Sequence, residues 1–224
     1  MGSEMDSVDE QVGTPVVPTR GNNSGGGLRA FFWEILQTVL LTLVIFLAVR
    51  AVVQNFKVEG ASMEPSLHSG QYLLINKIGY ARLQGTPAYA LVHPDSAAPS
   101  DPGYLFGGPQ RGDIIVFRSP VQPDKDFIKR VIGVPGDTVE IRGGQVLVNG
   151  TALDESYIRD RPPYVAPRQV VPPGHYFVLG DNRPNSSDSH VWGLVPADNI
   201  IGKAWVSYWP PNLWGVLAEP VYAR

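Results

Sequence analysis

The chain has 224 residues, enough for one large domain or two small ones, and its 43% apolar and 17% charged residues are typical of a globular protein. The formal net charge of −3 gives no basic footprint for nucleic acid, and the absence of cysteine excludes disulfides, thiolate metal sites and a cysteine nucleophile. The 24 glycines and 21 prolines favour many turns and short strands over long helices.

The first 29 residues are predicted to form a disordered tail. Acidic and polar residues and proline dominate this segment, which also contains the run Ser24-Gly25-Gly26-Gly27. Little apolar surface is available there to offset the entropy of ordering the backbone.

Residues 30–53 are predicted to form a single-pass membrane anchor. The stretch from Ile35 to Val49 carries no charge and, with its flanks, approaches the ~20 residues that cross a bilayer. Glu34 and Arg50 fall near its ends, where their side chains can reach the lipid headgroups. A buried core helix and a cleaved signal peptide are the alternatives. The length of the run and the lack of a clear small-residue cleavage site after it favour an uncleaved anchor.

The charges that flank the apolar run do not fix its orientation in a membrane. Arg20 and Arg29 precede the run, while Arg50 and Lys57 follow it, so positive charge is nearly balanced between the two sides. An expected orientation therefore has to come from other features of the chain.

Residues 54–224 are predicted to form a mainly β domain. Short runs of β-forming residues alternate with turn residues, which is typical of a sandwich or barrel-like fold. Thr138–Ile141 and Gln145–Val148 flank Arg142-Gly143-Gly144, a pattern that predicts a hairpin. The other expected strands are Gln71–Lys77, Asp113–Arg118, Phe127–Val134, Tyr176–Gly180 and Ala204–Trp209. Residues 79–112, rich in Pro, Gly, Ala and Ser, are predicted to be a long, partly disordered insertion.

Ser62 is a candidate nucleophile because of its neighbours in the run Gly60-Ala61-Ser62-Met63-Glu64-Pro65. A lone serine in a turn is weak evidence for catalysis. Gly60, however, allows a ligand to approach the backbone closely, and Pro65 fixes a turn beyond the serine. The backbone amide of Ser62 can then donate to an oxyanion, as such groups do in acyl transfer.

Lys129 is a candidate base in an otherwise apolar strand. Successive side chains alternate along a strand, so Lys129 and Arg130 must face opposite ways and one of them must point toward the apolar side. Burial disfavours the charged ammonium and lowers its pKa. To be mostly neutral near pH 7 the amine needs its pKa lowered by roughly 3, which corresponds to about 4 kcal/mol. That requires a dry pocket with hydroxyl partners.

The segment Gly180–His190 (GDNRPNSSDSH) has the composition of a polar, turn-rich surface loop. The functional alternative makes one of its hydroxyls a hydrogen-bond partner of the lysine amine and its carboxylates braces for the loop. A Ser-His-Asp triad using His175 or His190 stays open. No metal or nucleotide site is expected, because no glycine-rich phosphate loop is present and the histidines lack ligand spacing. These histidines are His68, His93, His175 and His190.

Together these segments resemble the bacterial type I signal peptidases, membrane-bound serine proteases that remove signal peptides from exported preproteins. The resemblance runs from the predicted anchor to about Tyr208. It rests on four motifs that occur in the family's order after an N-terminal anchor. These are Ser62–Leu67 (SMEPSL), Arg111–Phe117 (RGDIIVF), Lys129–Asp137 (KRVIGVPGD), and Gly180–Arg183 (GDNR) with Ser186-x-Asp188-Ser189.

The resemblance implies roles for residues in the reaction itself. Ser62 would be the nucleophile and Lys129 the general base, and Ser186 would supply the hydroxyl that orients the lysine amine. Asp181 and Asp188 would support the site.

The resemblance also implies a mainly β catalytic fold on the outer face of the membrane, with the N-terminus in the cytoplasm. No metal or cofactor is expected, and the partners would be the lipid bilayer and the signal peptides of preproteins, with no nucleic acid. Cleavage would follow small residues at the −1 and −3 positions. Phe56, Val58 and Ile128 would line the shallow pockets for those residues. The sequence does not indicate an oligomeric state.

Two positions depart from the family's pattern. Gly60 stands where some members place a serine hydroxyl in the oxyanion hole, so only backbone donation is expected here. His190 stands where arginine usually follows the Asp188-Ser189 pair. An ion pair there would depend on pH, because histidine titrates near neutrality. The 79–112 insertion lies outside the matched motifs.

Two other classes of protein stay open at this point. One is a related serine–lysine protease with a narrower role, such as processing a pilin or conjugation protein, or self-cleavage as in the SOS-repressor relatives. The anchor and the lack of a DNA-binding segment argue against the repressor version. The other is a non-catalytic, membrane-anchored β module that binds extracellular peptides.

Overall fold

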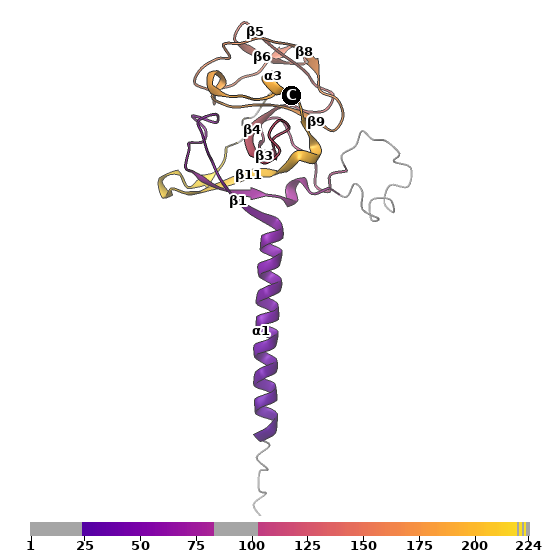
Figure 1. The fold of residues 1–224 in the computed structure, drawn as a ribbon, viewed down its shortest axis with the longest axis vertical. Coiled ribbons are helices and arrows are strands. Elements are labelled where there is room, and N and C mark those ends of the chain that lie inside the picture. The colour runs from indigo at the N-terminus through magenta and orange to yellow at the C-terminus, as the bar shows by residue number, and fades with distance from the viewer. Residues whose placement is uncertain (1–23, 83–102, 219, 221, 223–224) are drawn as a thin grey trace, which may run out of the picture. The chain divides into compact units, whose positions relative to one another are not determined.

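A computed structural model describes residues 24–82, 103–218, 220 and 222 (Figure 1). Most of the tail predicted for residues 1–29 and the centre of the 79–112 insertion lie outside these residues. The chain contains two compact units that divide after Ile45.

Helix α1 (Ser24–Val52) contains the predicted anchor and begins before the expected start at residue 30. The part from Gly27 to Val52 has a mean hydropathy of 2.3, and its length and composition suffice to cross a membrane. Every side chain from residue 27 to residue 51 is exposed, unlike those of a buried core helix. The Thr38 hydroxyl donates to the Glu34 carbonyl, and the Thr42 hydroxyl donates to the Thr38 carbonyl. Both hydroxyls therefore have hydrogen-bond partners within the helix.

The larger sheet follows α1 in the chain, and all its pairings are antiparallel. Its strand order is β1-β2-β11-β3-β4-β9-β10, and β12 pairs with β11. The strands are β1 (Val53–Lys57), β2 (Tyr72–Asn76), β3 (Ile114–Arg118), β4 (Asp126–Gly133), β9 (His175–Leu179), β10 (Val195–Pro196), β11 (Ile200–Trp209) and β12 (Gly215–Val216).

The smaller sheet has the order β7-β6-β5-β8 and is also antiparallel. Its strands are β5 (Thr138–Arg142), β6 (Gln145–Val148), β7 (Thr151–Ala152) and β8 (Ala166–Val170). In Figure 1 the strands β5, β6 and β8 lie together at one end of the β unit, and β1 and β11 lie at the other end. The remaining short helices are η1 (Ile78–Tyr80), η2 (Arg183–Asn185), α3 (Ser189–Trp192), η3 (Ala197–Asn199) and η4 (Pro211–Leu213).

The predicted fold class, mainly β with an N-terminal apolar helix, is confirmed. Each expected strand is present within a few residues of its predicted ends, and the β5–β6 hairpin turns at Gly143 and Gly144, both with positive φ. The sequence did not predict β1 or β8. β1 continues the apolar run of α1 without a turn signal, and β8 is an exposed edge strand that contains Pro167.

Both faces of β4 are covered by other parts of the protein. The alternation of side chains along a strand predicted only that one of Lys129 and Arg130 would point toward the apolar side. Lys129 and Arg130 are adjacent in β4, yet only 5% of the first residue and 2% of the second are exposed. Neither of these neighbouring side chains therefore points into solvent. A buried charge requires a partner, so the surroundings of both residues have to supply hydrogen bonds or opposite charge.

A buried ion pair fixes the loop that follows β9. Arg183 has no exposed surface, and it donates to both carboxylate oxygens of Glu155, at 2.9 and 2.6 Å. Its Nε also donates to the Gly180 carbonyl at 3.0 Å. The guanidinium therefore ties the start of the loop to the chain segment around Glu155, and the side chain supplies donors where the loop backbone leaves the sheet.

Removing Glu155 should destabilise the fold strongly. Glu155→Ala leaves the Arg183 charge buried without its partner, so we expect the free energy of unfolding to fall by about 3–5 kcal/mol. Glu140→Ala is the matched control, because its partner Arg142 is 67% exposed and a surface pair contributes less than about 1 kcal/mol. Urea unfolding of the full chain in detergent measures both. Equal, small effects of the two substitutions would contradict a structural role for the buried pair.

Candidate active site

The turn after β1 places Ser62 at the edge of a cleft. Gly60 starts the turn with a φ of +83°, a left-handed conformation that glycine adopts without strain. Met63 and Leu67 are buried in the core, and the Leu67 amide donates to the Met63 carbonyl at 2.9 Å. Two apolar side chains therefore anchor the turn and leave the partly exposed Ser62 at the cleft.

Lys129 contacts Ser62 from β4, although the two residues are 67 positions apart in the chain. The Lys129 Nζ atom donates to the Ser62 Oγ atom at 2.6 Å. Burial lowers the pKa of Lys129 from 10.5 to about 8, while the charges of Asp188 and Asp181 act in the opposite direction. At this distance a neutral amine can accept the proton of the serine hydroxyl.

Ser186 lies next to the nucleophile but is not bonded to the lysine. Its Oγ atom is buried, and among the residues that the structure describes it has no hydrogen-bond partner. A Cβ atom on Gly180 would overlap both Ser186 Oγ and the Ser62 carbonyl oxygen. Glycine at position 180 therefore lets the loop approach the nucleophile closely, with a free hydroxyl beside it.

Asp181 is buried against Arg130. The guanidinium donates to both carboxylate oxygens, at 2.9 and 2.6 Å, and also to the Gly112 carbonyl at 2.9 Å. It lies over the ring of Tyr157, 4.2 Å from the ring centroid. Sequence reasoning named Asp181 as a brace but missed Arg130 as its partner, because alternation along a strand says nothing about what covers the second face.

Asp188 is fully buried and bonded on both oxygens. One oxygen accepts from the Gly180 amide at 3.0 Å, and the other lies 2.6 Å from Nδ1 of His190. The His190 ring stacks on Tyr164, with centroids 3.6 Å apart and planes 5° apart. His190 therefore forms the side-chain contact with Asp188 in the position where the resemblance leads one to expect arginine.

The Ser-His-Asp alternative does not fit this arrangement. His190 Nδ1 is engaged with Asp188, and His175 Nδ1 lies 3.0 Å from the Pro173 carbonyl. The side chain that contacts Ser62 Oγ is that of Lys129. Within residues 24–82, 103–218, 220 and 222, no group of three His, Cys, Asp or Glu side chains is placed to hold a metal ion.

The cleft beside Ser62 and Lys129 has a volume of about 540 Å³. Phe56 and Ile128, two of the three predicted substrate-binding residues, line it. Val58 does not line this cleft. It is buried in the core, where Phe56 packs against its cluster. The remaining lining residues are Lys57, Glu59, Lys125, Asp126, Phe127 and Ser187.

Two strand edges at the cleft carry backbone groups without a strand partner among the described residues. β1 pairs only with β2. β9 pairs with β4 only from Arg130 onward, so residues 126–129 of β4 pair on one side alone, with β3. Such edges can accept an extended peptide as an added strand.

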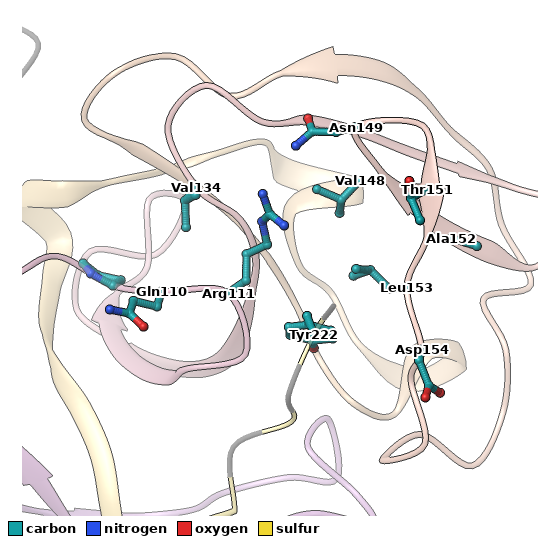
Figure 2. Close-up of a pocket in the computed structure, with 11 residues that line it drawn as sticks. Gln110, Arg111, Val134, Val148, Asn149, Thr151, Ala152, Leu153, Asp154 and Tyr222 are labelled. Carbon is teal, nitrogen blue, oxygen red and sulfur yellow. The ribbon is translucent and has the colours of Figure 1, made fainter. Parts of the chain in front are cut away.

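A larger cavity, of about 670 Å³, lies elsewhere in the β unit (Figure 2). Gln110 and Arg111 line one side of it and the β6–β7 turn lines the other, with Tyr222 between them. The guanidinium of Arg111 is bound by Asp137 through bonds of 2.8 and 2.7 Å. None of the predicted site residues lines this cavity, so its size does not make it the candidate site.

Comparison with known proteins finds a matching family and similar relatives over most of the chain. Residues 32–209 match the family described as "Signal peptidase, peptidase S26". The chain is 38% identical to a signal peptidase I of Leptolyngbya laminosa, over 98% of each chain. It is 39% identical to a probable signal peptidase I-1 of Synechocystis sp., over 84% of this chain and 88% of that one. A crystal structure of a signal peptidase I from Enterococcus faecalis has 38% identity and a TM-score of 0.37, covering 43% of this chain and 97% of that one.

Lys129 should reduce stability at neutral pH. The folded state lowers the pKa of Lys129 from 10.5 to about 8, so below pH 8 the fold holds a disfavoured charge. This difference corresponds to about 3 kcal/mol at most. Lys129→Met should therefore raise the free energy of unfolding at pH 7. The difference in the free energy of unfolding between the variant and the wild type should shrink between pH 8 and 10.5. In this range the folded wild type has released the Lys129 proton while the unfolded chain still holds it.

Urea unfolding of the full chain in detergent, at pH 7 and pH 10, measures this gap. Lys125→Met is the control, since Lys125 is exposed at the same cleft and its loss should change stability little at either pH. A gap between wild type and Lys129→Met that does not change with pH would contradict the proposed titration.

Proposed function

The chain belongs to the signal peptidase family, peptidase S26, and we propose that it cleaves N-terminal signal peptides from secreted preproteins with a dyad of Ser62 and Lys129. The observation that carries the proposal is the 2.6 Å contact between Ser62 Oγ and Nζ of the buried Lys129. A serine nucleophile requires a neighbouring base, and a lysine acts as one only when it is neutral.

The reaction starts with proton transfer. Neutral Lys129 takes the proton of the Ser62 hydroxyl, and Oγ attacks the carbonyl carbon of the peptide bond. Protonated Lys129 then gives its proton to the leaving amine as the C–N bond breaks, which leaves an acyl-enzyme on Ser62. Lys129 next takes a proton from water, whose oxygen attacks the ester carbonyl carbon. Protonated Lys129 returns this proton to Ser62 Oγ as the ester C–O bond breaks, which releases the signal peptide and restores the neutral amine.

The Ser62 amide stabilises the oxyanion in both steps. Position 60 is glycine and supplies no hydroxyl, so donation comes from the backbone. A backbone donor is already oriented before the reaction, provided that its peptide plane is held in place.

Ser186, Asp181 and Asp188 support the base. The hydroxyl of Ser186 has no hydrogen-bond partner among the described residues and, like the Ser62 carbonyl oxygen, lies against Gly180, and in this proposal it orients the Lys129 amine during the reaction. The two carboxylates raise the pKa of Lys129 against the effect of burial, which keeps the amine from becoming too weak a base.

The cleft selects substrates with small residues at −1 and −3. Phe56 and Ile128 line it with apolar surface, and Val58 supports Phe56 from the core. An extended signal peptide adds to the free edges of β1 and β4, so that alternate side chains point toward these residues. Large side chains at those two positions would not fit pockets that end on a closely packed core.

The membrane delivers the substrate. In this proposal residues 30–53 anchor the enzyme, residues 1–29 are cytoplasmic and the catalytic domain, residues 54–224, lies outside the cytoplasm. Signal peptides occupy the same bilayer, so enzyme and substrate meet with restricted positions and orientations before chemistry begins.

Preprotein cleavage by the full chain in liposomes tests the dyad. Ser62→Ala removes the nucleophile and Lys129→Ala removes the base, so each should lower kcat/KM by about 10³-fold or more. Lys129→Arg should be equally inactive, because a guanidinium stays charged. Lys125→Ala, at the rim of the same cleft, should retain activity. Full activity of Ser62→Ala or Lys129→Ala would overturn the assignment of the dyad. A wild-type protein that binds the preprotein but does not cleave it would favour a non-catalytic module.

A further inference from the structure

One residue outside the cleft donates to the two peptide units that flank Ser62, one before it and one after it. Asn182 follows β9 in the Gly180–Asn182 segment, and its backbone amide donates to the Ser62 carbonyl at 3.0 Å. Its side-chain Nδ2 donates to the Ala61 carbonyl at 2.9 Å. The mechanism above gives no role to Asn182.

The bond to Ala61 fixes the direction of the Ser62 amide. The Ala61 carbonyl and the Ser62 N–H belong to the same planar peptide unit and point to opposite sides of it. A donor that holds the oxygen on one side therefore sets where the hydrogen points on the other. Hydrogen bonds in a chain also polarise one another, so donation to the Ala61 carbonyl strengthens the Ser62 N–H as a donor.

The local turn holds this peptide unit through one bond, from the Glu64 backbone amide to the Ala61 carbonyl at 3.2 Å. Gly60, just before it, has a φ of +83°, and no atom lies within 4 Å of where its Cβ would be. Ala61 is exposed. The peptide unit between Ala61 and Ser62 therefore has one longer bond from its own turn, and the shorter bond from Asn182 adds a second constraint on its orientation.

The side chain of Asn182 is held in the orientation that this role requires. Its Oδ1 accepts from Nδ2 of Asn185 at 3.1 Å, which leaves the NH₂ group to face the Ala61 carbonyl. The Asn185 amide also donates to the Asn182 carbonyl at 3.0 Å. The buried pair of Arg183 and Glu155 fixes the same loop to the rest of the fold.

We propose that Asn182 is a positioning residue for the reaction: by donating to the Ala61 and Ser62 carbonyls, it holds the Ser62 amide toward the oxyanion. This inference rests on the proposed function, in which Ser62 is the nucleophile and its amide is the oxyanion donor. Asn182 does not line the cleft but a separate polar hollow of about 210 Å³ with Glu64, Pro65 and Arg159 among its walls. Its loss should therefore affect the transition state and leave substrate binding unchanged.

Steady-state kinetics of the full chain in liposomes give the first test. Asn182→Ala and Asn182→Asp both remove the side-chain donor and keep the backbone donation to Ser62. Each should lower kcat by about 10-fold to 100-fold, because misplacement of a catalytic group reduces the rate on that scale, and should leave KM within about twofold. A kcat equal to the wild-type value in both variants would overturn the proposal.

A pair of inhibitors separates positioning from a general structural effect. A peptide aldehyde with a small residue at its end forms a bond between its carbonyl carbon and Ser62 Oγ. The carbonyl oxygen takes the electron pair, and the serine proton goes to Lys129. The matching peptide alcohol binds the cleft without a bond to Ser62. The Asn182 variants should lose affinity for the aldehyde by about the factor lost in kcat, with the alcohol affinity unchanged.

Partial unfolding of a variant weakens both apparent affinities by the same factor, so the ratio of the aldehyde affinity to the alcohol affinity remains informative. Asn199→Ala is the matched control, because it removes a similar bond, from Asn199 Nδ2 to the Arg118 carbonyl at 2.9 Å. It should change neither affinity nor kcat. Equal losses for aldehyde and alcohol would show a merely structural role and overturn the proposal. Activity in Ser62→Ala would instead defeat the proposed function itself, so the two failures are distinguishable.

Discussion

The burial of one lysine beside one serine dictates what the surrounding strands and loops of this protein must supply. Lys129 donates to Ser62 at 2.6 Å from a site that is 5% exposed, and burial lowers the pKa of the lysine to about 8. An exposed lysine would stay charged at neutral pH and would have no affinity for the serine proton. The fold therefore has to hold a strand with a basic side chain inside the protein.

The surrounding charges are arranged so that burial prevails over them. Asp181 and Asp188 both act to raise the pKa of Lys129, but each is already engaged. Asp181 is bonded to Arg130, and Asp188 is bonded to the Gly180 amide and contacts His190. Carboxylates with such partners exert a weaker field on a third group than free ones would. The loop after β9 thus supplies support to the base and, through Asn182, to the backbone of the nucleophile.

Much of this arrangement could be predicted from the sequence. The features that could not be predicted all depend on contacts between segments that are far apart in the chain. The apolar run, the short strands and the hairpin around Gly143 are local patterns, and the motif around Ser62 and that around Lys129 pointed to the pair that the structure brings together. What covers the second face of β4 depends on segments far away in the chain, so the burial of Arg130 against Asp181 was not foreseen. The position of Val58 in the core and the bonds of Asn182 depend on tertiary packing in the same way.

Titration of the Lys129 amine itself tests whether burial makes this lysine a base near neutral pH. Nuclear magnetic resonance of the full chain in detergent, with carbon-13 at the lysine Cε, gives one signal for each lysine, and the signal that Lys129→Met removes belongs to Lys129. We expect that signal to titrate with a midpoint of about 8, because the site is buried. A midpoint at the ordinary lysine value of 10.5 would contradict the account.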